Sequence, residues 1–359
     1  MQIIFNSECD YIKESIIFMA RYYNQEDFID LKEHLKKNSG YTRQVEKILT
    51  TMNVIYEEIE ARLTLPEEMR DCFKPLGGEE IIDNSLADFI LLETDEFSKM
   101  SLKEVRKELV KKFRENPKLF MNRASFQLEE DGISNEFEFI QAIEELPSVD
   151  DGMKWKIWHA YKNYEQYVDK LMDQVEKIVP IIKEVYQKHQ EKFSSFIQYW
   201  EDKTKDRKSF EEAFHQHVQF SFEDNSIIYV RPSFMGCNGM RLRDMGKETL
   251  TLFIGWMFKD ENIINSSRVT AEELCARLKL LSDPSKYEIL KLIKNKGLYG
   301  AQLAEQMNLT TATISHHVST LSNASLLTFE KDASRIYYHL NKDQVGFLLD
   351  QIRTDLLED

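Results

Sequence analysis

The most constraining feature of this sequence is a run of closely spaced helix starts and stops in residues 269–323. Leucines recur at helical spacing up to residue 281, and Asp283 can then cap a second helix whose first turn holds Pro284. That helix should stop at Gly297, and a third short helix is expected over residues 300–307. Thr310 is a suitable N-cap for a fourth helix. These signals predict four short helices that pack on one another.

The fourth predicted helix, residues 311–323, should carry small polar side chains on its outer face. Its inward positions are Ile314, Val318 and Leu321, which leaves as outward positions Ala312, Thr313, Ser315, His316 and Ser319. Residues 326–330 and 336–340 read as two strands around a short polar loop. Small side chains let a helix enter the major groove of DNA closely, and hydroxyl and imidazole groups can reach base edges or phosphates. We therefore predict a helix-turn-helix followed by a β-wing.

Three stretches of this region resemble the ArsR family of bacterial winged-helix regulators. They are LKLLSDPSKYEILKLI from residue 278, LAEQMNLTTATISHHVSTL from residue 303 and RIYYHL from residue 335, and they occur in the family's order and spacing. The resemblance covers about residues 274–357, roughly a quarter of the chain. It implies a DNA-binding transcriptional regulator, in most cases a repressor.

The predicted DNA-binding residues follow from this arrangement. Hydroxyl and imidazole groups at the fourth helix would form a ridge that projects outward without obstruction, and cations at the wing would contact the backbone. The candidates are Thr310, Thr311, Thr313, Ser315, His316, Ser319, Lys331 and Arg335. Lys331 and Arg335 could instead be solvated surface cations, and His317 is interpreted as structural because it lies three residues after the core position Ile314.

The resemblance also implies a homodimer that presents two recognition helices to a partly palindromic operator. In the family the outer helices of this domain form most of the dimer interface. The last segment has one apolar face at helical spacing, which needs a partner. The predicted interface residues are Leu274, Leu278, Val345, Leu348, Leu349, Ile352 and Leu356.

The sequence departs from the family pattern in three ways. Metal-sensing members carry a C-x-C near the third helix, whereas this chain has no cysteine at residues 298–301 and no His or Cys in its last helix, so neither a metal nor another cofactor is expected. Ser325 stands where the family usually has glycine after the recognition helix, which would cost about 1 kcal/mol if φ is positive there. No Lys or Arg occurs between Gly297 and Glu330, so phosphate affinity should be modest.

The chain before residue 268 reads as mainly helical with a small sheet. Gly and Pro total only 19 of 359 residues, which favours long helices. Expected helices cover residues 8–23, 41–63, 101–115, 135–146 and 152–200, and Pro180 should kink or interrupt the last of them. Expected strands cover residues 2–6, 217–222, 227–231 and 249–257 and would form one sheet.

An aromatic stripe at the start of the longest predicted helix has two interpretations. Rings recur every third residue and include Trp155, Trp158, Tyr161 and Tyr164. Such a stripe is most often core, because aromatic side chains bury large areas. The alternative is the wall of a pocket for an apolar small-molecule effector.

Charge is distributed unevenly along the chain. The net charge is −15, but residues 268–340 carry nine Lys and Arg against seven Asp and Glu, so only this stretch could face DNA without a large electrostatic penalty. No apolar run is long enough for a membrane span, and no secretory signal is visible at the start, so we expect a cytoplasmic protein without membrane contact. The four cysteines lack ligand spacing, and no catalytic residue is identified because no phosphate-binding loop, nucleophile elbow or zinc motif occurs.

Together these observations predict an α+β protein that is mainly α with small β elements, and not an enzyme. The expected domains are a helical N-terminal domain (1–206), a small β-rich subdomain (207–260) and a winged helix-turn-helix for DNA binding and dimerisation (268–359). The predicted function is regulation of transcription by a homodimer bound to double-stranded DNA, with an N-terminal domain that adds dimer contacts or senses an effector. The alternatives are a winged-helix protein-interaction scaffold that does not bind DNA, and an N-terminal domain that binds a small molecule.

Overall fold

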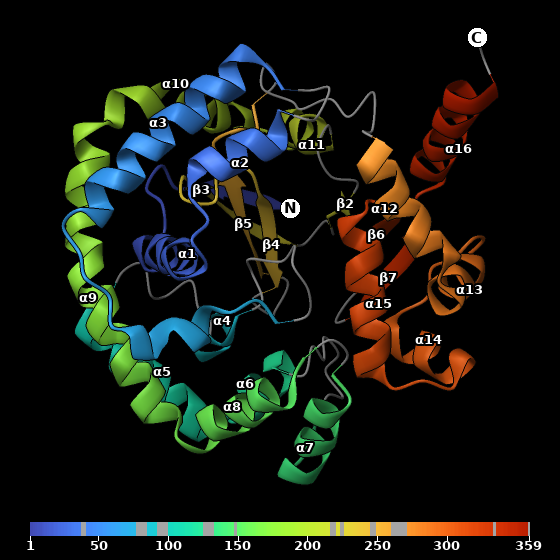
Figure 1. The fold of residues 1–359 in the computed structure, drawn as a ribbon, viewed down its shortest axis with the longest axis horizontal. Helices are drawn as coiled ribbons and strands as arrows, with labels where there is room; N and C mark the ends of the chain where they lie inside the picture. The colour runs from blue at the N-terminus through green and yellow to red at the C-terminus, as the bar shows by residue number, and fades with distance from the viewer. Residues whose placement is uncertain are drawn as a thin grey trace.

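The computed structural model describes residues 1–36, 41–76, 85–91, 100–124, 133–146, 149–215, 220–222, 226–244, 249–259, 271–332 and 335–357. The fold is mainly helical with small sheets, as the sequence predicts. Its buried apolar side chains form two clusters, one between Cys9 and Met257 and one between Leu274 and Leu348. Figure 1 shows the corresponding N-terminal and C-terminal parts side by side.

A four-stranded sheet lies inside the N-terminal part (Figure 1). Its order is β1-β3-β5-β4, with bounds Gln2–Phe5, Ile227–Ser233, Thr249–Gly255 and Met240–Asp244. β1, β3 and β5 are parallel, and β4 runs antiparallel to β5. β3 and β5 are central and largely buried, in accord with their nearly continuous apolar sequences. The predicted opening strand thus joins this sheet, whereas β4 was not predicted.

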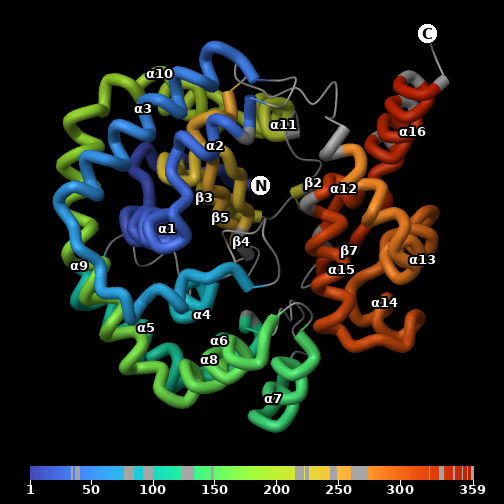
Figure 2. Tube along the Cα trace, in the orientation of Figure 1, coloured from blue at the N-terminus to red at the C-terminus, as the bar shows by residue number. Residues whose placement is uncertain are grey.

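Helices surround this sheet in an arch (Figure 2). Their bounds are α1 Tyr11–Asn24, α2 Phe28–Leu35, α3 Arg43–Glu60, the 3-10 helix η1 Glu67–Phe73, α4 Leu86–Ile90, α5 Leu102–Glu115, α6 Lys118–Ala124, α7 Glu136–Glu144, α8 Asp151–Lys162, α9 Tyr164–Lys188, α10 Gln190–Lys203 and α11 Arg207–His215. Side-chain caps open several of them, as at Asp10 and Ser101. No helix among the described residues has both the length and the apolar character needed to span a bilayer.

The segment of residues 152–200, predicted as one helix, forms the three helices α8, α9 and α10. Neither break between them falls at Pro180. α9 runs through Pro180 without interruption, and the breaks fall at Asn163 and His189, whose backbones leave the helical region. Proline removes one backbone donor, but Ile178 and Ile182 on either side are fully buried. Packing of this face therefore outweighs the lost hydrogen bond.

The aromatic stripe is packed into the N-terminal core. Tyr161 and Tyr164 are buried, the Tyr164 ring stacks on Phe113 at 4.0 Å, and the Tyr164 hydroxyl donates to the carbonyl oxygen of Ile90 at 2.5 Å. Trp158 packs against the same core, and Trp155 is 59% exposed at the surface. The contacts of the described rings match the core interpretation of the stripe.

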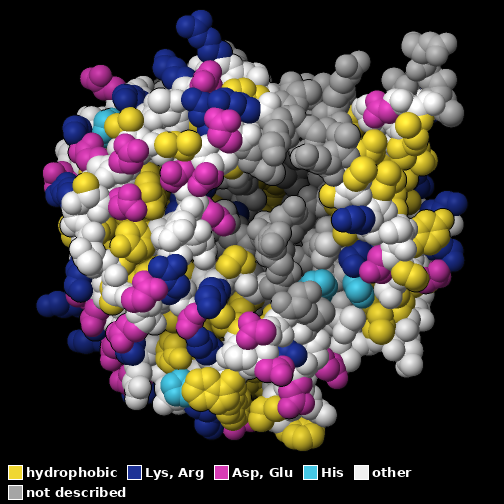
Figure 3. All heavy atoms as spheres, in the orientation of Figure 1, with side chains coloured by type: hydrophobic (Ala, Val, Ile, Leu, Met, Phe, Trp, Pro, Cys, Tyr) yellow, Lys and Arg dark blue, Asp and Glu magenta, His cyan; other side chains and the backbone are white. Residues whose placement is uncertain are grey.

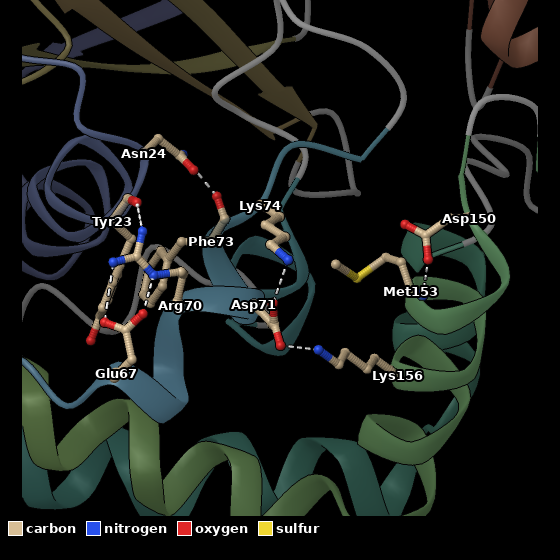
Figure 4. A network of polar contacts seen from close by, with 10 residues as sticks. All are labelled: Tyr23, Asn24, Glu67, Arg70, Asp71, Phe73, Lys74, Asp150, Met153 and Lys156. Atoms are coloured by element: carbon tan, nitrogen blue, oxygen red, sulfur yellow. Dashed lines mark hydrogen bonds and ion pairs between the residues drawn. The ribbon is translucent and has the colours of Figure 1, made fainter.

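Polar groups tie α1 to its neighbours inside this part. The buried Glu14 carboxylate accepts hydrogen bonds from the hydroxyls of Tyr186 and Ser233 and from the backbone N–H groups of Phe234 and Met235. Burial raises the pKa of Glu14, although these hydrogen bonds act in the opposite direction. A second network, drawn in Figure 4, joins α1, η1 and α8. It includes an Arg70 hydrogen bond to the Tyr23 carbonyl oxygen and ion pairs of Asp71 with Lys74 and Lys156.

The C-terminal part has the order predicted for a winged helix. Its elements are α12 Ala271–Ser282, α13 Pro284–Leu292, α14 Gly300–Met307, α15 Thr311–Asn323, β6 Leu327–Asp332, β7 Arg335–Leu340 and α16 Lys342–Leu357. β6 and β7 pair antiparallel as the wing, and Leu298 bridges to Tyr338 on the free edge of β7. On the other edge, β2 (Phe220–Ser221) pairs parallel with β6. The strand predicted at residues 217–222 therefore joins the wing and not the N-terminal sheet; residues 217–219 lie outside the described residues.

Candidate nucleic-acid interface

The turn between α14 and α15 is built by two local devices. Asn308 adopts φ 54° and ψ 45°, the left-handed conformation that ends many helices, and its N–H bonds back to α14. The Thr310 hydroxyl oxygen then accepts a hydrogen bond from the Thr313 N–H at 3.2 Å. This confirms Thr310 as the cap of α15.

The hydroxyl groups of α15 fall into two classes. Those of Thr320 and Ser322 donate to the carbonyl oxygens four residues earlier, both at 2.8 Å, and that of Thr313 bonds to the Thr310 hydroxyl at 2.9 Å. Within the described part of the chain, the hydroxyls of three further residues make no hydrogen bond, and these are Thr311, Ser315 and Ser319. Their spacing of four residues places them in one row along the helix.

One predicted outward residue of α15 is wrongly placed. Ala312 is 1% exposed, so its methyl group is buried and cannot contact a base. The buried face of α15 therefore includes Ala312 in addition to the three predicted inward positions, Ile314, Val318 and Leu321. The remaining predicted residues of α15 are half-buried.

The two histidines of α15 are both half-buried. Their ring centroids are 6.0 Å apart. The His317 Nδ1 atom is buried without a hydrogen-bond partner among the described residues, and burial lowers the pKa of His317, helped by the neighbouring ammonium of Lys286 and opposed by Asp283. Lys286 itself is buried and pairs with Asp283 at 3.0 Å. These surroundings fit a structural role for His317, and His316 remains a candidate contact.

Arg335 is an exposed cation of the wing, and its side chain contacts an aromatic ring. Its guanidinium carbon lies 4.5 Å from the centroid of the Tyr299 ring, and that ring makes an edge contact with Tyr337 at 5.5 Å. The aromatic contact supports the Arg335 side chain next to the start of α14. Sequence reasoning missed Tyr299, because only the fold brings it beside the wing. Lys331 lies in β6, and its side chain is outside the described residues.

The outer face of α15 is less accessible than expected. Every described side chain from Thr311 to Ser322 is half-buried or buried, although Thr310 is exposed. In Figure 1, α15 lies at the edge of the C-terminal part nearest the N-terminal part, and α13 lies at the opposite edge. The predicted ridge from Thr311 to Ser319 is therefore only partly exposed in this conformation.

The predicted dimer residues separate into interior and surface positions. Leu274 and Leu348 are 8% and 0% exposed and belong to the domain's own core, so they are not free to meet a partner. Leu278, Val345 and Ile352 pack partly on that core. Leu349 and Leu356 are 58% and 76% exposed on α16. Figure 3 shows apolar side chains gathered over the α12 and α16 side of this part.

Few cations of the C-terminal part are close to α15 in sequence. Lys291 pairs with Glu288 at 2.7 Å, and Lys294 and Lys296 are exposed after α13. No group of three or more metal-ligating side chains occurs among the described residues. The described chemistry of this surface is therefore hydroxyl, imidazole and guanidinium groups.

Comparisons with known proteins match this same part of the chain. The model of the family described as "Bacterial regulatory protein, arsR family" matches residues 283–328. The arsenical resistance operon repressor of Staphylococcus xylosus is 36% identical over 86 residues, 23% of this chain and 83% of that protein. The transcriptional repressor SdpR of Bacillus subtilis is 32% identical over 78 residues, 21% of this chain and 87% of that protein.

Two solved structures also align with about a quarter of the chain. NolR from Sinorhizobium fredii is 25% identical, with a TM-score of 0.21, and the alignment covers 24% of this chain and 87% of NolR. Reduced HlyU from Vibrio cholerae is 18% identical, with a TM-score of 0.20, and the alignment covers 24% of this chain and 92% of HlyU. The curated relatives share most of their length with residues that build the helix-turn-helix and wing. By its C-terminal part, this chain belongs to the ArsR family of bacterial regulatory proteins.

Proposed function

We propose that the chain is a DNA-binding transcriptional repressor that acts as a homodimer on a partly palindromic operator. The membership of the ArsR family and the repressor names of two relatives support this function. The N-terminal part would serve as a dimerisation or effector-sensing module. Its separate hydrophobic core supports a role distinct from DNA contact.

The observation that carries the proposal is the row of unbonded hydroxyls on the second helix of a helix-turn-helix. Thr311, Ser315 and Ser319 have hydrogen-bonding capacity that the described fold does not use. Serine and threonine can donate to or accept from base edges in the major groove. A helix with such a row would read bases, and Arg335 would contact the DNA backbone from the wing.

Dimer symmetry gives the operator its form. Two copies of α15 that read successive major grooves must lie about 34 Å apart, so the half-sites would repeat after one turn of the duplex. Exposed Leu349 and Leu356 on α16 support a partner surface in the same part of the chain. The operator would therefore be partly palindromic.

The test is DNA binding by the purified full-length chain. Duplexes enriched from a random library, and the region upstream of the chain's own gene, would be titrated at low salt by fluorescence anisotropy. We expect Ser315→Ala, His316→Ala and Arg335→Ala each to weaken binding about fivefold to 100-fold, since a contact of this kind contributes about 1–3 kcal/mol. Ser322→Ala is the matched control, because its hydroxyl is already bonded to the Val318 carbonyl oxygen at 2.8 Å.

Binding without sequence preference, or equal affinity of the Ser315→Ala and Ser322→Ala variants, would contradict the proposed mode of recognition. A reporter gene placed behind the enriched sequence tests repression itself. Expression should rise when the chain is deleted and fall when it is restored. The opposite response would make the protein an activator.

A second candidate is a winged-helix protein-interaction scaffold. The absence of Lys and Arg between Gly297 and Glu330, together with the half-buried face of α15, favours it. Complete lack of binding to any duplex at low salt, in every variant described here, would select this function over the first.

A further inference from the structure

The wing is extended by a strand that comes from the N-terminal part of the chain. β2 adds to the free edge of β6 in parallel, with Phe220 opposite Phe329 and Ser221 opposite Glu330. The wing sheet therefore runs from Leu298 through β7 and β6 to β2. An exposed strand edge readily accepts another strand, because its N–H and C=O groups are unpaired. Here the added strand belongs to the same molecule.

β2 is attached firmly to the N-terminal core on its other side. The next residue, Phe222, is 6% exposed, and its ring lies 5.6 Å from the Phe210 ring and 5.1 Å from the Phe214 ring of α11. Arg207 at the start of α11 donates a hydrogen bond to the Phe222 carbonyl oxygen at 3.4 Å. Phe329 of β6 packs against both hydrophobic clusters. These residues join the wing to the N-terminal core.

This attachment coincides with the limited access to α15. The side chains of Thr311, Ser315 and Ser319 are half-buried, and α15 lies at the edge of the C-terminal part that faces the N-terminal part (Figure 1). The first 267 residues carry a net charge of −14, whereas residues 268–340 carry +2. A duplex that approached α15 in this arrangement would meet the acidic part of the chain, and the two polyanions would repel each other.

We propose that the pairing of β2 with β6 is a latch that holds the protein in a self-inhibited state, in which the N-terminal part restricts access of DNA to α15. The inference rests on the proposed DNA-binding function. Release of β2 frees the wing edge and lets the C-terminal part turn away from the acidic surface. Among the described residues the latch comprises two residue pairs, so the closed and open states can exchange. A signal sensed by the N-terminal part acts by moving α11 and β2.

A reversible covalent lock tests the closed state directly. Neighbouring strands lie about 4.8 Å apart, within the Cα separation that a disulfide accepts. Ser221→Cys and Glu330→Cys would be combined in a Cys275→Ser background, since Cys275 is exposed and the other three native cysteines are buried. The single Glu330→Cys variant in the same background is the matched control.

We expect the oxidised double variant to form an intramolecular disulfide and to bind an enriched duplex at least tenfold more weakly than its reduced form. Reduction with dithiothreitol should restore binding, and the single variant should not respond to oxidant. Failure of the disulfide to form would overturn the proposal, because β2 and β6 would not be neighbours in solution. Equal affinity of the oxidised and reduced forms would also overturn it.

Proline substitutions test the open state. Successive N–H groups of a strand point to opposite sides, so only one of Phe220→Pro and Ser221→Pro removes a donor directed at β6. We expect that variant to bind the duplex at least tenfold more tightly than wild type and the other to bind like wild type. If neither variant gains affinity, the latch does not limit DNA binding.

Failure of the latch is distinguishable from failure of the proposed function. Sequence-preferred binding by wild type that neither the lock nor the proline variants change would retain the DNA-binding function and overturn the latch. Absence of binding to all duplexes by wild type, by the reduced double variant and by both proline variants would overturn both.

Discussion

Ser325 follows α15 in a backbone conformation that suits glycine better than serine. Its φ is 59°, so the strain that the sequence comparison anticipated at this position is present. Its N–H bonds to the Ser322 carbonyl oxygen at 2.8 Å, and the next N–H bonds back to Leu321 at 3.0 Å. These bonds end the helix and direct the chain into β6, which explains why a strained residue is held there.

Ser325→Gly should stabilise the C-terminal part by about 1 kcal/mol, because glycine adopts positive φ without a Cβ clash. All four tryptophans precede residue 257, so backbone amide hydrogen exchange of residues 284–340 reports this part more directly than fluorescence. We expect exchange to slow about fivefold. Ser322→Gly, inside α15, is the matched control and should accelerate exchange. An exchange rate of Ser325→Gly equal to that of wild type would show that the strain is relieved elsewhere.

His317 should make the C-terminal part less stable in mild acid. Burial lowers the pKa of His317 below its ordinary value of about 6.5, so the unfolded chain takes up this proton first as the pH falls. The stability that the neutral His317 ring contributes is therefore fully present above a pH of about 6.5, the pKa in the unfolded chain. It is lost as the pH falls from there through the lower pKa of the folded protein. Amide exchange of α15 at pH 7 and pH 5, corrected for intrinsic rates, would measure the loss.

His317→Gln should show a smaller loss between these two pH values than wild type. His159→Gln on α8 controls for the removal of a histidine at a remote position. An identical pH response of wild type and His317→Gln would assign the effect to other groups.

Helix starts were predictable where a single residue supplies the cap, and strand partners were not. The predicted stop at Gly297 was wrong, because α13 already ends at Leu292. Asp283 caps α13 and Thr310 caps α15 as predicted, because an N-cap acts through its own side chain over two or three residues. The helix is not interrupted at Pro180, because buried packing on both sides, which sequence does not display, holds α9 together. The partner of β2 was also missed, because a two-residue strand carries no signal for a partner strand more than 100 positions away.

At the interface site, periodicity placed the hydroxyl row but not its accessibility. The spacing of Thr311, Ser315 and Ser319 follows from the helix itself. The burial of Ala312, Leu274 and Leu348 depends on how elements meet in three dimensions, and so does the half-burial of the hydroxyl row. Local chemistry was therefore more predictable than exposure.

α16 supplies the dimer surface if the proposed homodimer forms. Leu349 and Leu356 are seven residues apart, lie on one face and are exposed. Burial of a leucine contributes about 1.5–3 kcal/mol, and each substitution removes two such contacts from a symmetric dimer. Leu356→Glu should therefore raise the dimer dissociation constant at least 100-fold. Sedimentation velocity over a concentration series would measure it.

Lys342→Glu, an exposed change at the start of the same helix, is the control for α16 and should leave the dimer intact. A wild-type chain that sediments as a monomer at all concentrations, or a Leu356→Glu variant that remains dimeric, would exclude α16 as the interface. In the second case the N-terminal part would be the dimerisation module.

The whole chain combines an acidic N-terminal part with a C-terminal part that is nearly neutral. Most of the net charge of −15 lies before residue 268, and residues 268–340 carry a net charge of +2. Long-range attraction to DNA is therefore weak, and affinity must come from short-range contacts of α15 and the wing. Such a protein would discriminate between sequences without binding all DNA tightly.

The salt dependence of binding measures this balance. A dimer that contacts phosphates with Arg335 and Lys331 of each subunit should release about four counterions, so the logarithm of its affinity should fall with the logarithm of salt concentration with a slope of about −4. Arg335→Gln should reduce the slope by about 2, whereas Lys291→Gln should not change it, because Lys291 pairs with Glu288. A slope near −10 would mean that many more cations reach the backbone than the wing supplies, and the acidic part would then have to move far from the duplex.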